Sequence, residues 1–268
     1  MKKILITLLV IPCLFSCSTN SLTGSKQFLL VSDADMEQMS FAEYQKVVST
    51  SKVLSPNNNK NAAMVQKVAN KLVAAITDYY TKKGLGAELA NYKWEVNLID
   101  ENTVNAWCMP GGKIVVYTGL LPVTQNKTAL AIVMGHEIAH AIAKHGAARM
   151  SQSLATQLGG LALSEAVKTK PQETQALYNT AFGVVSNVGV ILPFSRKNEL
   201  EADKFGLQFA ALAGYNPREA IPFWQRMSQG GGQKPPEFLS THPSDERRIA
   251  DLQAMMDDVV KNYYKPVK

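Results

Sequence analysis

The spacing of apolar positions along the chain predicts a protein built mainly from helices. Ser32, with Asp35 three residues later, is typical of a helix start, so we expect a helix through the forties. A second helix over 60–82 is predicted by apolar residues that recur every three or four positions: Val65, Val68, Leu72 and Ile76. Similar patterns predict helices over 126–150, 196–213, 217–228 and 244–262.

Residues 151–194 carry a weaker pattern. They are rich in Ala, Gly, Val and Ser, and they predict one or two helices. The stretch from Ala181 to Phe194 is strongly apolar but too short to span a membrane. We therefore expect it to be a buried helix.

A few short extended runs predict a small sheet. Apolar and polar residues alternate over 92–98, which is typical of a half-buried strand. Pro110-Gly111-Gly112 separates two further extended runs, 104–109 and 113–118, and indicates a hairpin or another tight connection. The fold class predicted from these elements is α+β, mainly helical, with one compact domain over 32–268.

Composition excludes several classes of protein. The chain has 268 residues, of which 46% are hydrophobic and 12 are proline, so it is neither disordered nor collagen-like. With three cysteines it is also not a disulfide-stapled miniprotein. The formal net charge of +6 is modest and no segment is densely basic, so we expect no nucleic-acid partner.

The N-terminus has the pattern of a targeting signal. Lys2 and Lys3 precede an apolar run from Ile4 to Phe15, which as a helix measures about 18 Å against roughly 30 Å of hydrocarbon. Leu14-Phe15-Ser16-Cys17 resembles a bacterial lipobox, in which Cys17 is diacylated and becomes the first residue. We therefore expect a lipoprotein signal peptide over 1–16 and a lipid-anchored tether over 17–31. The alternative is an ordinary secretory signal that happens to contain cysteine.

Residues 136–140 carry the most informative pattern, His136-Glu137-Ile138-Ala139-His140. Because a helix turns about 100° per residue, the two histidines lie about 40° apart on one face and can bind one zinc ion. Glu137 lies at the flank of that face, where it can hold a water beside the metal and take its proton. The alternative is a pair of histidines satisfied by solvent or by the core.

A catalytic zinc ion needs a third protein ligand. Glu199 and Asp203 are four residues apart on a predicted helix and share a face, whereas Glu201 lies about 200° from Glu199. We therefore assign Glu199 as the third ligand and Asp203 as the residue that orients a ligand histidine. Glu201 is expected in a surface charge row with Lys197 and Lys204. The alternative for the Glu199–Asp203 pair is a solvated helix face.

Four sequence elements together resemble the HtpX / CAAX-prenyl-protease type of gluzincin zinc metallopeptidase, especially its envelope lipoprotein branch. The elements are Val104-Asn105-Ala106-Trp107 with Pro110-Gly111-Gly112-Lys113, the segment 135–140, Ser195-Arg196 with 199–203, and Thr241-His242-Pro243 with Arg248. The resemblance implies a zincin-type domain with a small sheet beside the helix that carries the two histidines. It also implies one zinc ion with Glu199 as a ligand.

The resemblance assigns roles to further residues. Asn105 and Ala106 take the position of a strand that lines the substrate cleft, although they also fit an ordinary strand and turn. His242 matches a histidine that approaches the metal, either as a displaceable cap or as a donor to the transition state. It follows the Gly-rich loop 229–240, which we expect to move. Arg248 on the next helix is placed to brace the carboxylates.

Two other residues have no assigned chemistry. Cys108 is expected to be buried or idle, because nothing else in the sequence supports a thiol protease. His145, rotated about 140° from His140 on a continuous helix, is expected behind the metal ligands or on the surface.

These inferences together predict a zinc metallo-endopeptidase of the cell envelope. We expect misfolded or partly extended envelope proteins as substrates, and membrane attachment through Cys17. Ser18 in place of Asp favours the outer membrane, facing the periplasm, if the source is Gram-negative. The alternative is an envelope assembly factor or chaperone whose metal stays capped. A structural zinc site is disfavoured, because such sites are closed by four protein ligands, often cysteines.

Overall fold

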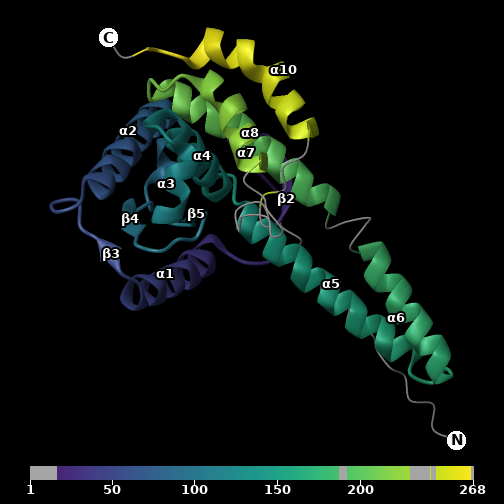
Figure 1. Ribbon diagram of the computed structural model, residues 1–268. Helices are drawn as coiled ribbons and strands as arrows, with labels where there is room; N and C mark the ends of the chain where they lie inside the picture. The colour runs from purple at the N-terminus through teal and green to yellow at the C-terminus, as the bar shows by residue number, and fades with distance from the viewer. Residues whose placement is uncertain (1–16, 187–191, 230–241, 243–245, 267–268) are drawn as a thin grey trace, which may run out of the picture.

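The structure is a computed structural model that describes residues 17–186, 192–229, 242 and 246–266 (Figure 1). Its α-helices are α1 (Asp33–Thr50), α2 (Lys60–Lys82), α3 (Leu121–Thr124), α4 (Lys127–Ile142), α5 (His145–Val167), α6 (Gln172–Ser186), α7 (Leu192–Leu212), α8 (Ala220–Gln229) and α10 (Glu246–Tyr263). Single turns of 3₁₀-helix occur at Gly86–Leu89, Thr118–Leu120 and Pro217–Glu219. The mainly helical α+β class is confirmed.

The small sheet carries the strand order β3-β4-β6-β5, from β3 (Val53–Leu54), β4 (Glu95–Ile99), β5 (Ala106–Met109) and β6 (Lys113–Tyr117). β5 and β6 form the predicted antiparallel hairpin, and β4 runs parallel to β6. Gly112 in the turn has a φ of 86°, and a Cβ there would lie 2.8 Å from the Trp94 ring, so only glycine fits. β5 is an edge strand, and it packs against α4.

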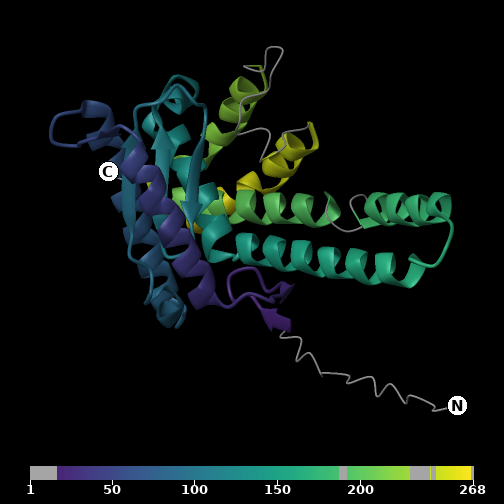
Figure 2. The same cartoon turned by 90° about the horizontal axis from the view of Figure 1, so that it is seen from below.

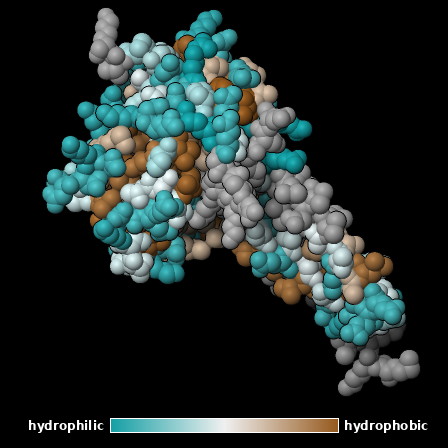
Figure 3. Space-filling view, viewed as in Figure 1, coloured by the Kyte–Doolittle hydropathy of each residue, from teal (hydrophilic) through white to brown (hydrophobic). Residues whose placement is uncertain are grey.

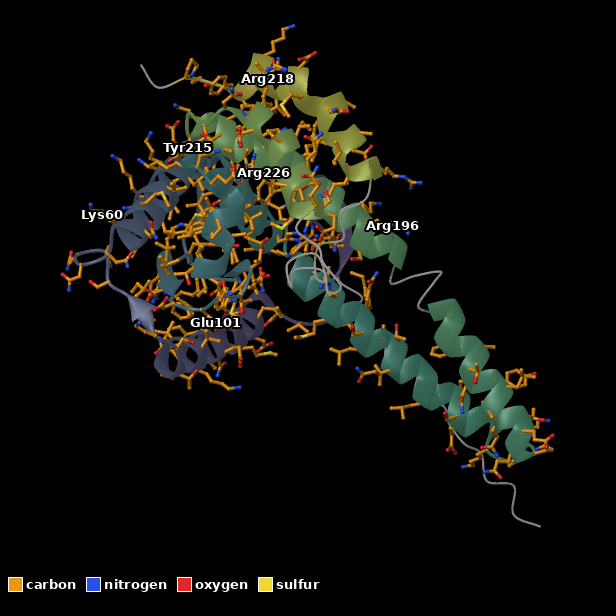
Figure 4. The ribbon with its side chains drawn as sticks, in the orientation of Figure 1. Lys60, Glu101, Arg196, Tyr215, Arg218 and Arg226 are labelled. Atoms are coloured by element: carbon orange, nitrogen blue, oxygen red, sulfur yellow. The ribbon has the colours of Figure 1, made fainter. Side chains whose placement is uncertain are left out.

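Both faces of this sheet are covered. On β6, Ile114 and Val116 join the main core with α2, α4 and α7, whereas Val115 on the opposite face packs with Tyr44 of α1. α4 lies at the centre of the main core and is buried along almost its whole length. Arg226 of α8, labelled in Figure 4, donates to the carbonyls of Val123 and Thr124 in α3, and these bonds hold α8 against α3.

The helix predicted over 126–150 is divided in two. α4 ends at Ile142, Lys144 takes a left-handed conformation with a φ of 56°, and α5 begins at His145 in a new direction. The side-chain amides of Asn20 and Gln27 donate to the carbonyls of Ile142 and Ala143, which have no partner within the helix. The expectation of one continuous helix is wrong, because contacts from a distant segment favour the break.

The segment expected to be a tether packs against the body of the protein. β1 (Cys17–Thr19) and β2 (Lys26–Phe28) pair to form a two-stranded sheet, here called the N-terminal hairpin. Besides its bonds to the end of α4, the chain reaches α5, where Ser151 accepts from the backbone N–H of Leu30 at 2.8 Å. Residues 18–30 therefore differ from a free tether, and the signal peptide predicted over 1–16 lies outside the described residues.

α5 and α6 lie side by side and project from the body as an arm (Figure 2). Several large apolar side chains on the arm are exposed, as the space-filling view shows (Figure 3): Leu154, Leu158, Leu161, Leu177 and Tyr178. In the described part of the buried helix predicted over 181–194, Ala181 and Gly183 are exposed and Phe182 is half-buried. That expectation is wrong there, because two helices alone cover only one side of each other. None of the described helices is both long enough and apolar enough to span a bilayer.

Two glycines allow α4 and α7 to pack in close contact. A Cβ on Gly135 would lie 2.8 Å from the Gly206 carbonyl oxygen, and one on Gly206 would lie 2.7 Å from the backbone nitrogen of His136. Both distances are shorter than any Cβ contact tolerates, and both involve backbone, which cannot rotate away. The spacing between the helix carrying His136 and the helix carrying Glu199 is therefore fixed at these two positions.

We predict that Gly206→Ala destabilises the protein by about 1–3 kcal/mol, because overpacking outweighs the gain of up to about 1 kcal/mol in helix propensity. The same variant is expected to bind zinc more weakly, because α4 and α7 must separate. Urea unfolding and zinc titration measure the two effects. Gly183→Ala on the arm is the matched control, since its Cβ meets no atom within 4 Å. Equal stability of the two variants would contradict the prediction.

Candidate metal centre

Four side chains that the sequence analysis singled out meet at one point. They are His136, His140, Glu199 and His242, and each offers a ligand atom within 4.8 Å of the others. The two histidines of α4 place their Nε2 atoms 3.1 Å apart. Glu199 of α7 lies across from them, with carboxylate oxygens 3.4 Å from each Nε2. His242, which precedes α10, places Nδ1 3.0 Å from Glu199 and 3.2 Å from His136.

These separations fit a tetrahedral zinc ion. Bonds of about 2.0–2.1 Å to four corners of a tetrahedron place the ligand atoms about 3.3–3.4 Å apart. The printed separations of 3.0–3.4 Å lie close to that spacing. Two imidazoles and one carboxylate are a known donor set of catalytic zinc sites, and the absence of sulfur argues against the usual structural sites. The residues present therefore fit zinc.

Asp203 and Arg248 support the cluster from behind. Asp203 lies 2.9 Å from Nδ1 of His136, on the side of the ring away from the other ligands. Arg248 of α10 donates two bonds of 2.7 Å to the Asp203 carboxylate, and its third guanidinium nitrogen, Nη1, lies 3.5 Å from Glu199. The orienting role expected of Asp203 and the bracing role expected of Arg248 both agree with these positions.

Trp224 of α8 is a member of the site that the sequence did not reveal. The Arg248 guanidinium lies 3.5 Å from the centre of its ring, and the His136 ring centroid lies 6.2 Å away. Because Arg248 is buried, the ring face replaces part of its hydration. In the sequence Trp224 is one of several apolar residues on an amphipathic helix, and no signal separates it from the core.

Burial and paired charges set the pKa values at the centre. Burial would lower the pKa of His136, but the carboxylates of Asp203 and Glu199 outweigh it and raise the pKa to about 9. Burial would raise the pKa of Glu199, but its three histidine neighbours hold the pKa well below its usual range. The pKa of Asp203 is likewise lowered against the effect of burial, chiefly by Arg248. Both carboxylates are therefore ionised and suited to a cation.

Glu137 occupies a different environment from the other two carboxylates. Its side chain is buried, and its Oε1 has no hydrogen-bond partner among the residues that the structure describes. Burial raises the pKa of Glu137, and His242, whose Nε2 lies 3.5 Å from Oε1, opposes that rise. A buried acceptor with a raised pKa beside the ligand cluster is suited to receive a proton from a water.

Asn105 and Ala106 are both buried at the start of the edge strand β5. The Asn105 side chain accepts from the backbone N–H of Ala106 at 2.9 Å, which shapes the turn into the strand. Cys108, two residues further along β5, is half-buried, and burial together with nearby Glu137 raises the pKa of its thiol. A thiol with a raised pKa is a poor nucleophile, which agrees with an idle cysteine.

Glu201 and His145 contact each other, and the sequence analysis did not foresee this. Glu201 does lie 3.7 Å from Lys197, as the expected charge row requires, but its carboxylate also lies 3.2 Å from Nε2 of His145. The Ser25 hydroxyl of the N-terminal hairpin donates to the same carboxylate. His145 in turn lies 2.8 Å from His140, because the break after α4 turns it back toward the centre.

Comparison with known proteins places this geometry in a family. The model of peptidase family M48 matches residues 39–256. The chain is 40% identical over 162 residues to the mitochondrial metalloendopeptidase OMA1 of Arabidopsis thaliana and 30% identical over 250 residues to that of Homo sapiens. It is 32% identical over 167 residues to the beta-barrel assembly-enhancing protease of Escherichia coli.

The three alignments cover 60%, 90% and 58% of this chain, but only 31%, 46% and 33% of the relatives' own lengths. The match of the family model, over residues 39–256, includes all four of the sequence elements that carry the resemblance. It also spans α4, α7 and residue 242, which supply the four clustered side chains. The chain belongs to peptidase family M48.

Proposed function

We propose that the chain is a zinc-dependent metallo-endopeptidase. The observation that carries the proposal is the Oε1 atom of Glu137, which is buried beside a cluster of two histidines and a carboxylate and has no hydrogen-bond partner among the described residues. A structural metal site has no use for such a group. His136, His140 and Glu199 would hold the ion, and His242 stands at a fourth corner.

Zinc, when bound, would supply a Lewis acid that polarises the scissile carbonyl and makes a neighbouring water more acidic. Glu137 accepts the proton of the attacking water at Oε1 and then delivers it to the leaving amine. Asp203 holds the His136 ring through Nδ1, so that Nε2 keeps its orientation during turnover. Arg248 keeps Asp203 and Glu199 ionised in a buried setting.

The proposed role of Glu137 predicts that Glu137→Gln retains zinc and fold but loses about 10²–10⁴-fold in peptidase rate. The amide keeps the shape of the side chain and cannot accept the proton. Casein-type proteolysis, with metal content measured on the same samples, tests this. Glu173→Gln, a substitution in the first turn of α6, is the matched control. Undiminished proteolysis by Glu137→Gln would reject the mechanism.

His242 is proposed to cap the metal in a resting state. Its Nδ1 lies among the ligand atoms, and its Nε2 points at the oxygen of Glu137 that would otherwise receive a water. A histidine in this position competes with the water for both partners. The loop expected to carry it away, 229–240, lies almost wholly outside the described residues.

Capping predicts that His242→Ala raises basal proteolysis while zinc remains bound through the other three ligands. If His242 instead donates a hydrogen bond to the tetrahedral intermediate, the same variant lowers turnover with zinc retained. Initial rates and metal content of the purified variant distinguish the two roles. A fall in turnover would therefore reject the cap and leave the donor.

The edge strand β5 is proposed to bind substrate. An extended peptide can add to such an edge through main-chain hydrogen bonds, with little demand on side-chain identity. β5 begins at Ala106, directly after Asn105, and packs on the helix that carries Glu137. Their positions support the role that the resemblance gives to these two residues.

The proposed setting is the cell envelope, with the protein lipid-anchored to the outer membrane and facing the periplasm. The apolar run before Cys17 supports this proposal, and so do the names of the bacterial relatives, which are beta-barrel assembly-enhancing proteases. Misfolded envelope proteins are the proposed substrates. The second candidate function, an assembly factor with a rarely active metal, is favoured by the position of His242 and requires that binding of client proteins survive Glu137→Gln.

If the protein is anchored by lipid on Cys17, we predict that Cys17→Ser abolishes incorporation of a clickable fatty acid and releases the protein from the membrane fraction. The reason is that the diacylglyceryl group attaches through the Cys17 sulfur, which serine lacks. Cys108→Ser, in the edge strand, is the control and should remain labelled. Label retained by the Cys17 variant would reject the lipoprotein assignment.

A further inference from the structure

Three acidic residues alternate along α7, and two of them belong to the centre already described. Glu199 faces the ligand cluster, and Asp203 contacts the outer nitrogen of His136. Glu201, between them in the sequence, lies about 200° around the helix from Glu199 and points elsewhere. It nevertheless reaches the centre by a second route, which passes through His145.

The route runs through two imidazole rings in sequence. The Nε2 atom of His140 faces the cluster, 3.4 Å from Glu199 and 3.1 Å from His136. Its other nitrogen, Nδ1, lies 2.8 Å from Nδ1 of His145. The remaining nitrogen of His145 lies 3.2 Å from the Glu201 carboxylate. A continuous series of hydrogen bonds, here called the His140–His145–Glu201 relay, therefore connects the ligand histidine to a carboxylate.

The chemistry of a metal ligand determines which atom donates and which accepts at each contact of the His140–His145–Glu201 relay. A neutral imidazole that offers Nε2 to a cation must carry its proton on Nδ1, so His140 donates to His145. His145 accepts at Nδ1, and its own proton is then on Nε2, from which it donates to Glu201. Each contact has one donor and one acceptor, and Glu201 completes the chain because an ionised carboxylate only accepts.

The Glu201 end of the relay has a further hydrogen-bond partner. The second carboxylate oxygen of Glu201 accepts from the hydroxyl of Ser25, in the turn of the N-terminal hairpin. His145 is 2% exposed and the Glu201 side chain is 15% exposed, so both are largely shielded from water. The hairpin that follows Cys17 thus contributes a hydrogen bond to the support of the metal centre.

We propose that His145 and Glu201 are positioning residues for His140, which lock its tautomer and ring orientation for the metal. The proposal rests on the proposed zinc site. Under this proposal a carboxylate orients each of the two ligand histidines. Asp203 contacts His136 directly, whereas Glu201 acts on His140 through the imidazole of His145. The competing role for Glu201 is a surface ion pair with Lys197, whose side chain is 54% exposed.

The test is competitive zinc titration against a chelator, with each variant made in the full-length Glu137→Gln chain so that proteolysis does not interfere. Glu201→Ala is expected to weaken zinc binding about 10–100-fold, as loss of such supporting groups does. Glu201→Gln is expected to lose less than about tenfold, since its amide oxygen still accepts from His145. Lys197→Ala is the matched control and should bind zinc like the parent.

A double-mutant cycle tests whether His145 and Glu201 act on zinc binding through the same series of hydrogen bonds. If they do, His145→Ala combined with Glu201→Ala binds zinc no more weakly than His145→Ala alone. If they act separately, the two losses multiply, and that result would overturn the proposal. Because His145 is buried and its variant can fail to fold, the comparison of Glu201→Ala with Lys197→Ala decides the matter on its own.

Thermal unfolding without metal separates positioning from a plain structural role. A positioning residue changes the zinc dissociation constant with little change in the Tm of the metal-free protein. A lower metal-free Tm with unchanged zinc affinity in Glu201→Ala would overturn the proposal. It would leave the proposed function intact, because that function fails only if the parent chain binds no zinc or if Glu137→Gln still cleaves.

Discussion

The close approach of α4 and α7 is the constraint on which the metal centre depends. The two helices carry three of the four clustered side chains, and they supply them at the right separation only because glycines face each other at positions 135 and 206. The contact is backbone against backbone, which is stiffer than any packing of side chains. It sits one residue before His136, so an error in helix spacing would pass directly to the ligand atoms.

The second constraint is the cost of burying charge. A buried carboxylate is expensive unless it is paired, and two of the three buried acidic side chains, Glu199 and Asp203, have cationic or imidazole partners. Arg248 is shared between Asp203 and Glu199, and the Trp224 ring covers its guanidinium. Of these three carboxylates, Glu137 is the one that keeps an oxygen with no hydrogen-bond partner among the residues that the structure describes. That oxygen lies beside the ligand cluster, where the proposed reaction needs an acceptor for the proton of a water.

Local periodicity was enough to predict α2 and to place Glu199 and Asp203 on one face of a helix. Apolar residues that recur every three or four positions predicted α2 with its observed ends, Lys60 and Lys82. The rotation of about 100° per residue placed Glu199 and Asp203 on one face of a helix and Glu201 on another. The same arithmetic left two places open for His145, behind the ligands or on the surface, because it assumed a continuous helix where Lys144 breaks it; the break brings His145 to the first of them, against His140. Nothing within that stretch signals the break, which depends on carbonyl contacts from Asn20 and Gln27 more than a hundred residues away.

The central claim is that one zinc ion is held by His136, His140 and Glu199 within a peptidase site. Anomalous diffraction at the zinc absorption edge, from crystals of the zinc-loaded chain, tests it most directly. The account predicts a single strong peak about 2.0–2.2 Å from Nε2 of both histidines and from a carboxylate oxygen of Glu199. A peak bound elsewhere, or full zinc loading without a peak at this cluster, would contradict it.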